Sequence, residues 1–413
     1  MNKKYTLTDE QEKAVTHLYE SDATLLIAAT GSGKTLTTLH TLNELVLGGA
    51  IKKILILCPA KVVKVWTHEM KKWGLALPVI VSSYDSVHKV IKDTTIDAVV
   101  FDEITRLRSS GGAAFKKIRH VLKRFTWRCG LSATPVSEDL MGLYGMTMML
   151  DGGERFGNRK DSFMLKYFNQ MDYKGYKFEV KPEREKELIN KVKELIYVMG
   201  ADDSKVVERT VRVEVPSDIV TLQSRFTVSG KGADKIPVAN AAVLQGKILQ
   251  LNQGLLVDAG EILWLGRFDI VSDILADDLG GVVTYQFVLV REEFKRRYPW
   301  ADFIDGSSTK QEFDEIITRW RNGGGKLLFL QVSAGSHGLD GLQFSSDRMI
   351  HFAPIYSNDR TIQLNGRLDR KGQRSATVTV INLVATGVYD EKVVNMVGDK
   401  KAIMPKFLSH LKS

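Results

Sequence analysis

A phosphate-binding loop is the clearest chemical feature of the sequence. Its residues are Thr30, Gly31, Ser32, Gly33, Lys34 and Thr35, which open a helical stretch directly after an apolar run. Small residues let backbone N–H groups surround phosphate oxygens, and a helix N-terminus adds partial positive charge. Lys34 would reach the β- and γ-phosphates, and the Thr35 hydroxyl would ligate Mg²⁺. The loop therefore predicts binding of ATP with Mg²⁺, although Ala28 replaces the first glycine of the general pattern.

An acidic pair, Asp102 and Glu103, follows a second apolar run. At the end of a neighbouring strand, Asp102 would hold Mg²⁺ through water, and Glu103 would orient or deprotonate the attacking water. A strand that ends in an acidic surface turn gives the same pattern. We assign the acidic pair to the ATP site because of its order and distance after the phosphate-binding loop. We therefore predict ATP hydrolysis, with Lys34 and Glu103 as catalytic residues.

Apolar runs alternate with helical stretches in two parts of the chain. The first part has candidate strands at 24–29, 53–58, 78–82, 97–101 and 126–131, and the second at 281–290, 302–306, 326–333, 347–354 and 376–384. Continuous apolar runs are typical of parallel strands that are buried on both faces. We predict an α/β fold with two lobes, residues 1–155 and 241–413, joined by a partly helical insertion or linker, residues 156–240.

Composition limits the class of protein. The sequence has 58 Lys and Arg against 49 Asp and Glu, a net charge of +9 that favours a polyanionic partner without establishing one. Cys58 and Cys129 stand in apolar runs and are predicted to be buried thiols, not a disulfide or a metal site. No apolar run approaches the ~18 residues of a membrane span, and no targeting signal is visible. We expect a soluble, cytoplasmic monomer with no membrane partner.

Four further stretches complete an ordered set of motifs: 7–11, 58–73, 82–84 and 131–135. Together with the loop and the acidic pair they resemble helicase superfamily two, most closely the Swi/Snf-type ATPases, which implies RecA-like lobes. The first stretch is similar to an adenine-reading element, which implies a base contact from Gln11. The last implies that Ser132 and Thr134 couple the ATP site to a nucleic-acid track. The two middle stretches imply track contacts from Pro59, Ala60, Lys61 and Ser83, to which Lys64 is added for its charge.

The second lobe carries the more discriminating match. Residues 333–340 resemble motif five, and residues 363–373 match motif six, QxxGRxxRxGQ, nearly residue for residue. The match implies that Arg367 and Arg370 are arginine fingers, and their spacing places both on one face of a helix. The same match implies nucleotide contacts from Gly338, Asp340 and Gln363, and track contacts from Ser333 and Ala334. A solvated basic helix is the alternative for the two arginines.

The resemblance implies a DNA-dependent ATPase, a small phage- or bacterial-type motor that translocates on duplex DNA and remodels DNA or protein–DNA complexes. Two features depart from the Swi/Snf pattern: Thr105 stands where many relatives have histidine, and motif three is SATP. A strand-separating or branch-migration helicase stays open, and it would need a wedge hairpin, for which 151–210 is the only room. An ATP-gated clamp with little turnover also stays open. The basic stretches 115–128 and 291–298 are track contacts or solvated helix faces.

Overall fold

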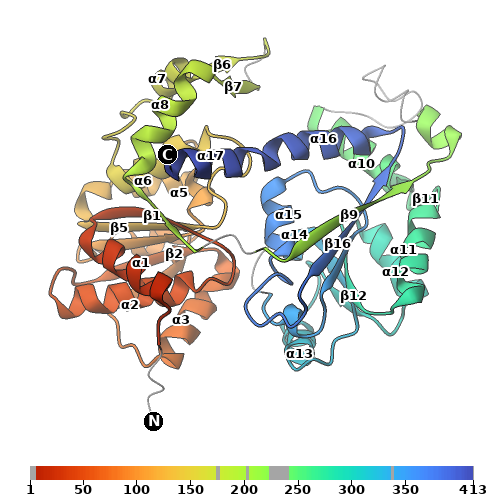
Figure 1. Ribbon diagram of the computed structural model, residues 1–413, viewed down its shortest axis with the longest axis horizontal. Coiled ribbons are helices and arrows are strands. Elements are labelled where there is room, and N and C mark those ends of the chain that lie inside the picture. Colours follow the sequence, from red (N-terminus) through yellow and green to blue (C-terminus); the bar gives the residue numbers. More distant parts are fainter. Residues whose placement is uncertain (1–5, 174–176, 201–203, 223–240, 336–338, 413) are drawn as a thin grey trace. The chain divides into compact units, whose positions relative to one another are not determined.

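The chain folds into two units, each built around its own sheet (Figure 1). The computed structural model describes residues 6–173, 177–200, 204–222, 241–335 and 339–412. Unit 1 comprises Met1–Asp202 and Lys400–Ser413, and unit 2 comprises Asp203–Asp399. Each contains a six-stranded parallel sheet with helices, which confirms the predicted α/β fold with two RecA-like lobes. No helix in the described ranges is long and apolar enough to cross a membrane.

The sheet of unit 1 has the strand order β3-β2-β4-β5-β1-β8. Its strands are β1 Ala23–Ala28, β2 Ile54–Cys58, β3 Val79–Ser83, β4 Ala98–Asp102, β5 Trp127–Ser132 and β8 Ile196–Met199. The first five match the predicted strands within about one residue. Because every neighbouring pair is parallel, the carboxyl ends of all six strands meet at one edge of the sheet.

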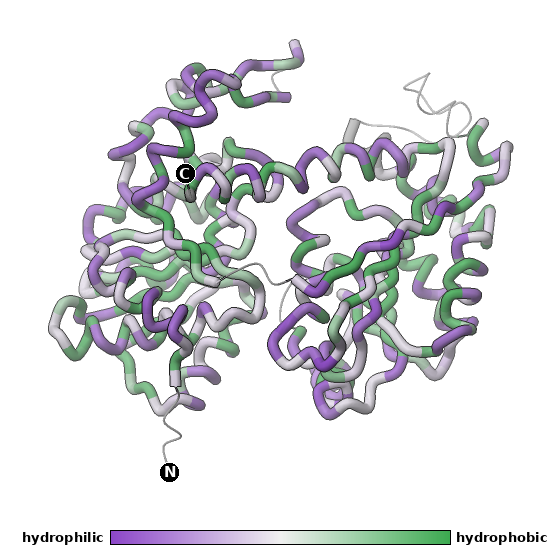
Figure 2. Tube along the Cα trace, in the orientation of Figure 1, coloured by the Kyte–Doolittle hydropathy of each residue, from purple (hydrophilic) through white to green (hydrophobic). Residues whose placement is uncertain are grey.

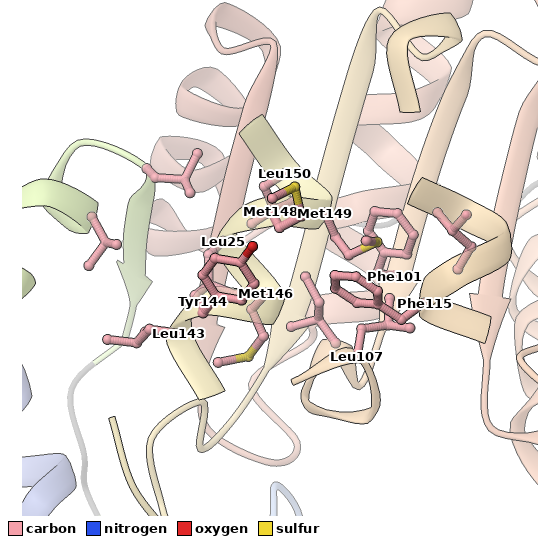
Figure 3. Packing of buried hydrophobic residues seen from close by; sticks show 14 of the residues in the cluster. Leu25, Phe101, Leu107, Phe115, Leu143, Tyr144, Met146, Met148, Met149 and Leu150 are labelled. Atoms are coloured by element: carbon pink, nitrogen blue, oxygen red, sulfur yellow. The ribbon is translucent and has the colours of Figure 1, made fainter. Parts of the chain in front are cut away.

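Helices cover both faces of this sheet. They are α1 Asp9–Glu20, α2 Lys34–Leu47, α3 Val63–Lys72, α4 Val87–Val90, α5 Ala113–Arg119, α6 Gly142–Asp151, α7 Lys160–Tyr167, α8 Pro182–Lys193 and α17 Ile403–Lys412, with 3₁₀ turns η1 Ala60–Val62, η2 Ile104–Leu107 and η3 Leu122–Arg124. Figure 3 shows α6 placing Met146 and Met149 in a buried apolar cluster with Leu25 and Phe101. This packing holds the strands of the candidate nucleotide site from one side of the sheet.

The sheet of unit 2 has the order β13-β14-β12-β15-β16-β9 and is also parallel throughout. Its strands are β9 Val206–Val213, β12 Gly281–Tyr285, β13 Asp302–Ile304, β14 Leu327–Gln331, β15 Arg348–His351 and β16 Val378–Ala385. The other elements are α10 Ala241–Asn252, α11 Gly266–Asp277, α12 Val288–Arg297, α13 Lys310–Arg321, α14 Val332–Gly335, α15 Asn358–Asn365, α16 Tyr389–Lys401, η4 Val257–Ala259, η5 Leu342–Phe344 and the pair β10 Leu255–Leu256 with β11 Glu261–Ile262. The predicted strand 281–290 is therefore too long, since its second half opens α12.

The boundaries of the units differ from the predicted ones, 1–155, 156–240 and 241–413. The stretch expected to be an insertion supplies an edge strand to each sheet, β8 to the first and β9 to the second. Edge strands are half exposed and tolerate charges, so β9 has no continuous apolar run to reveal it. The residues after 399 also belong to unit 1, where Phe407 is buried in the core and Lys406 pairs with Glu185.

A small hairpin extends from unit 1 between α7 and α8 (Figure 1). Its strands, β6 Phe168–Gln170 and β7 Phe178–Val180, pair antiparallel. Hydrophobic residues gather in the strands of both sheets, whereas α8 beside the hairpin is largely hydrophilic (Figure 2). The stretch between the two predicted lobes therefore contains a pair of antiparallel strands.

Candidate nucleotide and nucleic-acid sites

The phosphate-binding loop lies between β1 and α2, as the sequence predicts. Gly31 and Gly33 have φ angles of 84° and 93°, in the left-handed region that favours glycine. A Cβ atom on Gly33 would lie 2.2 Å from Nε2 of Gln11, so a side chain there would strain the backbone and also displace the Gln11 amide from the loop. The turn leads into the N-terminus of the 14-residue helix α2, the arrangement that binds phosphate groups.

Two polar side chains form hydrogen bonds with backbone oxygens of this loop and of the strand end before it. Gln11 precedes the loop in the sequence, and Lys34 belongs to it. The Gln11 amide, on a residue that is 7% exposed, donates from Nε2 to the backbone oxygen of Ser32 at 3.0 Å. The Lys34 ammonium donates to the backbone oxygens of Ala28 and Ala29 at 2.6 and 2.9 Å. A polyphosphate would offer this ammonium charged acceptors, which form stronger hydrogen bonds than carbonyl groups. The structure thus brings the predicted adenine-reading residue and the predicted phosphate-binding lysine to one loop.

Asp102 ends β4, two strands away from the loop strand β1, with β5 between them. The indole Nε1 of Trp66 donates to Oδ2 of Asp102 at 2.8 Å. Burial raises the pKa of the Asp102 carboxyl group, while the hydrogen bond from Trp66 and the positive charge of Lys34 lower it. Because β1, β5 and β4 are neighbouring parallel strands, the loop and the acidic pair lie at the same edge of the sheet.

Glu103 has an unusual backbone conformation. With a φ angle of 57°, it is the only non-glycine residue with positive φ in the described part of the chain. Such conformations cost free energy and cluster at functional sites. The Thr105 hydroxyl donates to Oε1 of Glu103 at 3.0 Å. The threonine that departs from the family's common histidine therefore orients the carboxylate of the candidate general base.

The donor set at this site fits Mg²⁺. The carboxylate of Asp102 and the hydroxyl of Thr35 supply hard oxygen atoms, which Mg²⁺ prefers. Over the described ranges, no group of three or more His, Cys, Asp or Glu residues could hold a metal ion. Mg²⁺ bound with nucleotides commonly takes one or two protein ligands and completes its shell with phosphate and water. A magnesium ion shared with the nucleotide is therefore compatible with these residues.

The predicted coupling residues lie between the two halves of the nucleotide site. Ser132 ends β5 and is in register with Ile27 on β1, while its neighbour Leu131 is in register with Asp102 on β4. Ser132 is 1% exposed, and its Oγ accepts a hydrogen bond from the Thr134 backbone at 3.1 Å. A shift of this turn would act on both the loop strand and the acidic strand.

The predicted track contacts of unit 1 gather at the carboxyl ends of β2 and β3. Cys58, the last residue of β2, is in register with Ser83, the last residue of β3. After Cys58 the chain continues with Pro59, which is buried, and then Ala60, Lys61 and Lys64, which are exposed. These exposed groups stand at the same sheet edge as Asp102, because β2 pairs with β4.

The basic stretch 115–128 is not one helix, since it is divided among α5, η3 and β5. Three of its arginines donate to backbone oxygens within unit 1: Arg119 to Asn158 at 2.7 Å, Arg124 to Ile91 at 3.0 Å and Arg128 to Leu150 at 2.7 Å. The three lysines of this stretch, Lys116, Lys117 and Lys123, are exposed and remain candidates for track contacts.

The basic stretch 291–298 is paired with acidic residues inside unit 2. Arg291 binds Asp305 at 2.7 Å, and Arg296 and Arg297 each bind Glu293 at 2.7 Å. These three guanidinium groups have carboxylate partners within unit 2, which favours the alternative of a solvated helix face for this stretch.

Motif six differs from the prediction in its local structure. Helix α15 ends at Asn365 and Gly366 caps it, so Arg367 and Arg370 lie in the turns that follow instead of on a helix face. They still converge, because both donate from Nη1 to the backbone oxygen of Leu339, at 3.1 and 3.3 Å. The common target of the two arginines comes from the turn and not from helical spacing.

The two arginines differ in exposure. Arg367 is 8% exposed and also donates from Nε to the backbone oxygen of Gly335 at 3.2 Å. The Arg370 side chain is 20% exposed and pairs with Asp340 at 2.9 Å. Arg367 therefore holds the motif-five segment in place, in addition to any role that it has in catalysis. Arg370 instead has an ion pair with Asp340 that a phosphate could replace.

The remaining predicted residues of unit 2 are distributed around this turn. Ser333 is exposed and Ala334 is buried on the short helix α14. Gln363 donates from Nε2 to Asp359 of its own helix at 3.0 Å. Gly338 lies outside the described residues. Of the predicted nucleotide contacts in this unit, the structure places Asp340 directly against an arginine finger candidate.

Sequence reasoning missed three residues at the nucleotide site: Trp66, Tyr84 and Thr105. Trp66 is buried, at 1% exposed, and its indole binds Asp102. The Tyr84 hydroxyl donates to the Asp102 backbone oxygen at 2.9 Å. No sequence signal marks these contacts, because they depend on how α3 and the end of β3 pack beside β4.

Comparisons with known proteins point to one class of enzyme. Residues 4–76 match the family model described as type III restriction enzyme, res subunit. Over 99% of both chains the sequence is 24% identical to putative protein p41 of Acyrthosiphon pisum secondary endosymbiont phage 1. A third of the chain (33%) is 26% identical to the uncharacterized ATP-dependent helicase YqhH of Bacillus subtilis strain 168, over 29% of that protein. The family match and the helicase relative agree with the class predicted from the motifs.

The chain is also similar to solved structures of the Sulfolobus solfataricus SWI2/SNF2 ATPase core. In complex with double-stranded DNA that core gives a TM-score of 0.46 at 17% identity, over 99% of this chain and 94% of that one. The core domain alone gives 0.44 at 18% identity, over 98% and 91%.

Proposed function

We propose that this chain, an ATP hydrolase of helicase superfamily two with Swi/Snf-like motifs, is a motor that moves along duplex DNA and remodels DNA or protein–DNA complexes. One observation carries the proposal: the candidate nucleotide residues and the exposed residues after β2 stand at the same edge of one sheet. At such an edge, a conformational change caused by ATP binding or hydrolysis would reach the candidate track contacts through neighbouring strands of one sheet.

The residues of the nucleotide site divide the work of hydrolysis. Lys34 would bind the β- and γ-phosphates, and Glu103, oriented by Thr105, would accept a proton from the attacking water. Mg²⁺, when bound to Asp102 and Thr35, would neutralise charge on the phosphates. Arg367 and Arg370 would stabilise the charge that develops on the transferred phosphoryl group.

Movement over any sequence requires contacts to the phosphate backbone. In the proposal Lys61 and Lys64, both exposed, supply these contacts together with Ala60 and Ser83. ATP binding favours one conformation of the enzyme and hydrolysis the other, so the grip on the track alternates. The net charge of +9 supports a polyanionic track.

Replacing Lys61 and Lys64 together by alanine is expected to weaken duplex binding and flatten its salt dependence. Each phosphate contact contributes a slope of about −0.9 in log affinity against log salt, so the slope should lose about two units. The measurement is a duplex-DNA titration across a salt series. The matched control is Lys71→Ala with Lys72→Ala, which removes the same charge from the last turn of α3. An unchanged slope for the Lys61 and Lys64 variant would remove these residues from the track.

The hairpin β6–β7 favours a second candidate function, strand separation. Its base is anchored, because Phe168 is 6% exposed and its ring lies 5.5 Å from that of Phe163. Beyond β6 the described residues expose apolar surface: Met171 is 50% exposed and Tyr173 is fully exposed. Apolar wedges unstack base pairs when they enter between base steps, and aromatic rings stack on single-stranded bases. A rigid base with an exposed aromatic side chain has the form that a wedge requires.

Tyr173→Ala tests the wedge. Stacking on a base is worth about 1–3 kcal/mol, so we expect unwinding of a forked duplex to fall by at least about five-fold. Duplex-stimulated ATP hydrolysis should stay at the parent level, because the nucleotide site is untouched. Leu165→Ala, at an exposed apolar residue of α7, is the control. If the parent separates no strands, or if both variants unwind as well as the parent, the hairpin is not a wedge.

A further inference from the structure

We propose that Trp66 and Tyr84 are positioning residues that couple nucleic-acid contact to the magnesium-binding carboxylate within unit 1. The inference rests on the proposed function, which makes Asp102 a metal ligand and places the track at the ends of β2 and β3. Two side chains from those two track elements both donate hydrogen bonds to Asp102, one to its carboxylate and one to its backbone.

The first connection runs through α3. Lys64 and Trp66 stand two residues apart in the first turn of this helix, which begins at Val63. Lys64 is exposed, whereas Trp66 is 1% exposed and donates to Oδ2 of Asp102 at 2.8 Å. Because a helical turn moves as a unit, a displacement of Lys64 on a phosphate group would shift the indole N–H. That shift would change the direction in which the carboxylate faces the metal.

The second connection runs through the end of β3. Ser83, a predicted track contact, is followed directly by Tyr84, which is 5% exposed. The Tyr84 hydroxyl donates at 2.9 Å to the backbone oxygen of Asp102, which belongs to the peptide group joining Asp102 to Glu103. The left-handed conformation of Glu103, with φ of 57°, depends on the orientation of that peptide group. Tyr84 therefore positions the general base through the backbone, while Trp66 positions the metal ligand through its side chain.

Burial alone does not account for these two contacts. Tyr144 is also buried in unit 1, at 1% exposed, and its hydroxyl has no hydrogen-bond partner among the residues that the structure describes. Trp127 is 4% exposed and satisfies its indole N–H with the backbone oxygen of Leu18 at 3.0 Å. The core therefore accommodates such rings without a contact to the acidic pair. These two residues also provide matched controls for the experiment.

The test compares Tyr84→Phe and Trp66→Phe with the controls Tyr144→Phe and Trp127→Phe. Three quantities are measured: duplex-DNA affinity, the ratio of DNA-stimulated to basal ATP hydrolysis, and the Mg²⁺ midpoint for binding of a fluorescent ATP analogue. Partners that orient metal ligands commonly change metal affinity about 10- to 100-fold, so Trp66→Phe should raise the Mg²⁺ midpoint about 10-fold. Tyr84→Phe, which removes a single oxygen atom, should lower the stimulation ratio several-fold at unchanged DNA affinity.

The outcomes separate the coupling from the function on which it rests. Both controls are expected to keep the parent's stimulation ratio and Mg²⁺ midpoint. If the parent is stimulated by DNA and both test variants match it in ratio and midpoint, the coupling is overturned and the motor stands. If no nucleic acid stimulates the parent, the proposed function fails and the coupling fails with it. Should Trp66→Phe not fold, Tyr84→Phe decides the question, since its phenyl ring keeps the packing of the tyrosine.

Discussion

Glu103→Gln is expected to lower the rate of ATP hydrolysis by about 10²- to 10⁴-fold, the usual contribution of a general base. Glutamine keeps the size of the side chain and can still accept the hydrogen bond from Thr105, so the local structure should be retained. It cannot accept a proton from the attacking water. ATP binding should persist, because Lys34 and the loop are unchanged. Single-turnover hydrolysis and equilibrium ATP binding measure the two effects separately.

Lys34→Ala provides the contrast. The Lys34 ammonium is the group of the loop that would bind the phosphates, so this variant should lose much of its ATP binding as well as its turnover. A Glu103→Gln enzyme that hydrolyses ATP at the parent rate would show that another group is the general base. Loss of ATP binding in Glu103→Gln would mean that the strained turn at this residue has collapsed.

Arg370→Ala is expected to have the second large effect, a fall in kcat of about 10³-fold or more, with ATP binding largely retained. An arginine finger acts on charge that develops in the transition state. Its loss should therefore lower kcat much more than it lowers the affinity for ATP. Arg370 is a cleaner test than Arg367, which is buried and holds two backbone oxygens of the preceding segment. Removing Arg367 would delete both of these buried hydrogen bonds and destabilise unit 2.

Arg321→Ala is the matched control for Arg370→Ala. Arg321 also contacts Asp340, donating to its backbone oxygen at 3.2 Å, and its side chain is 54% exposed. Loss of either arginine removes a positive charge beside the same aspartate, but motif six includes only Arg370. Equal losses of kcat in the two variants would assign the effect to Asp340 or to local charge, and not to a finger.

The parts of the fold that sequence could predict are those with strong local signals. Continuous apolar runs located β1 to β5 within about one residue. The edge strand β9 escaped prediction because its charged residues interrupt the apolar run. The edge strand β8 escaped although its residues Ile196–Met199 are all apolar, because the run is short and follows closely on the helix α8. The return of α17 to unit 1 is a tertiary contact that no local pattern encodes.

The candidate site shows the same division. The loop and the acidic pair are each a short contiguous stretch of the sequence, so the chemistry of each could be predicted residue by residue. The hydrogen bonds from Trp66, Tyr84 and Thr105 could not be predicted. The first two join segments that are distant in sequence, and the third depends on the left-handed turn at Glu103. The spacing of Arg367 and Arg370 suggested a helix face, whereas the cap at Gly366 ends the helix before them.

The central claim is that a nucleic-acid track stimulates ATP hydrolysis by this chain. The most direct test is steady-state ATP hydrolysis without nucleic acid and with single-stranded DNA, duplex DNA, forked DNA and RNA, each repeated with Arg370→Ala. The account predicts strong stimulation by duplex DNA that disappears in the variant. Stimulation by single strands or forks alone would favour the strand-separating enzyme. No stimulation by any of them would contradict the account, because the enzyme would then hydrolyse ATP without a track.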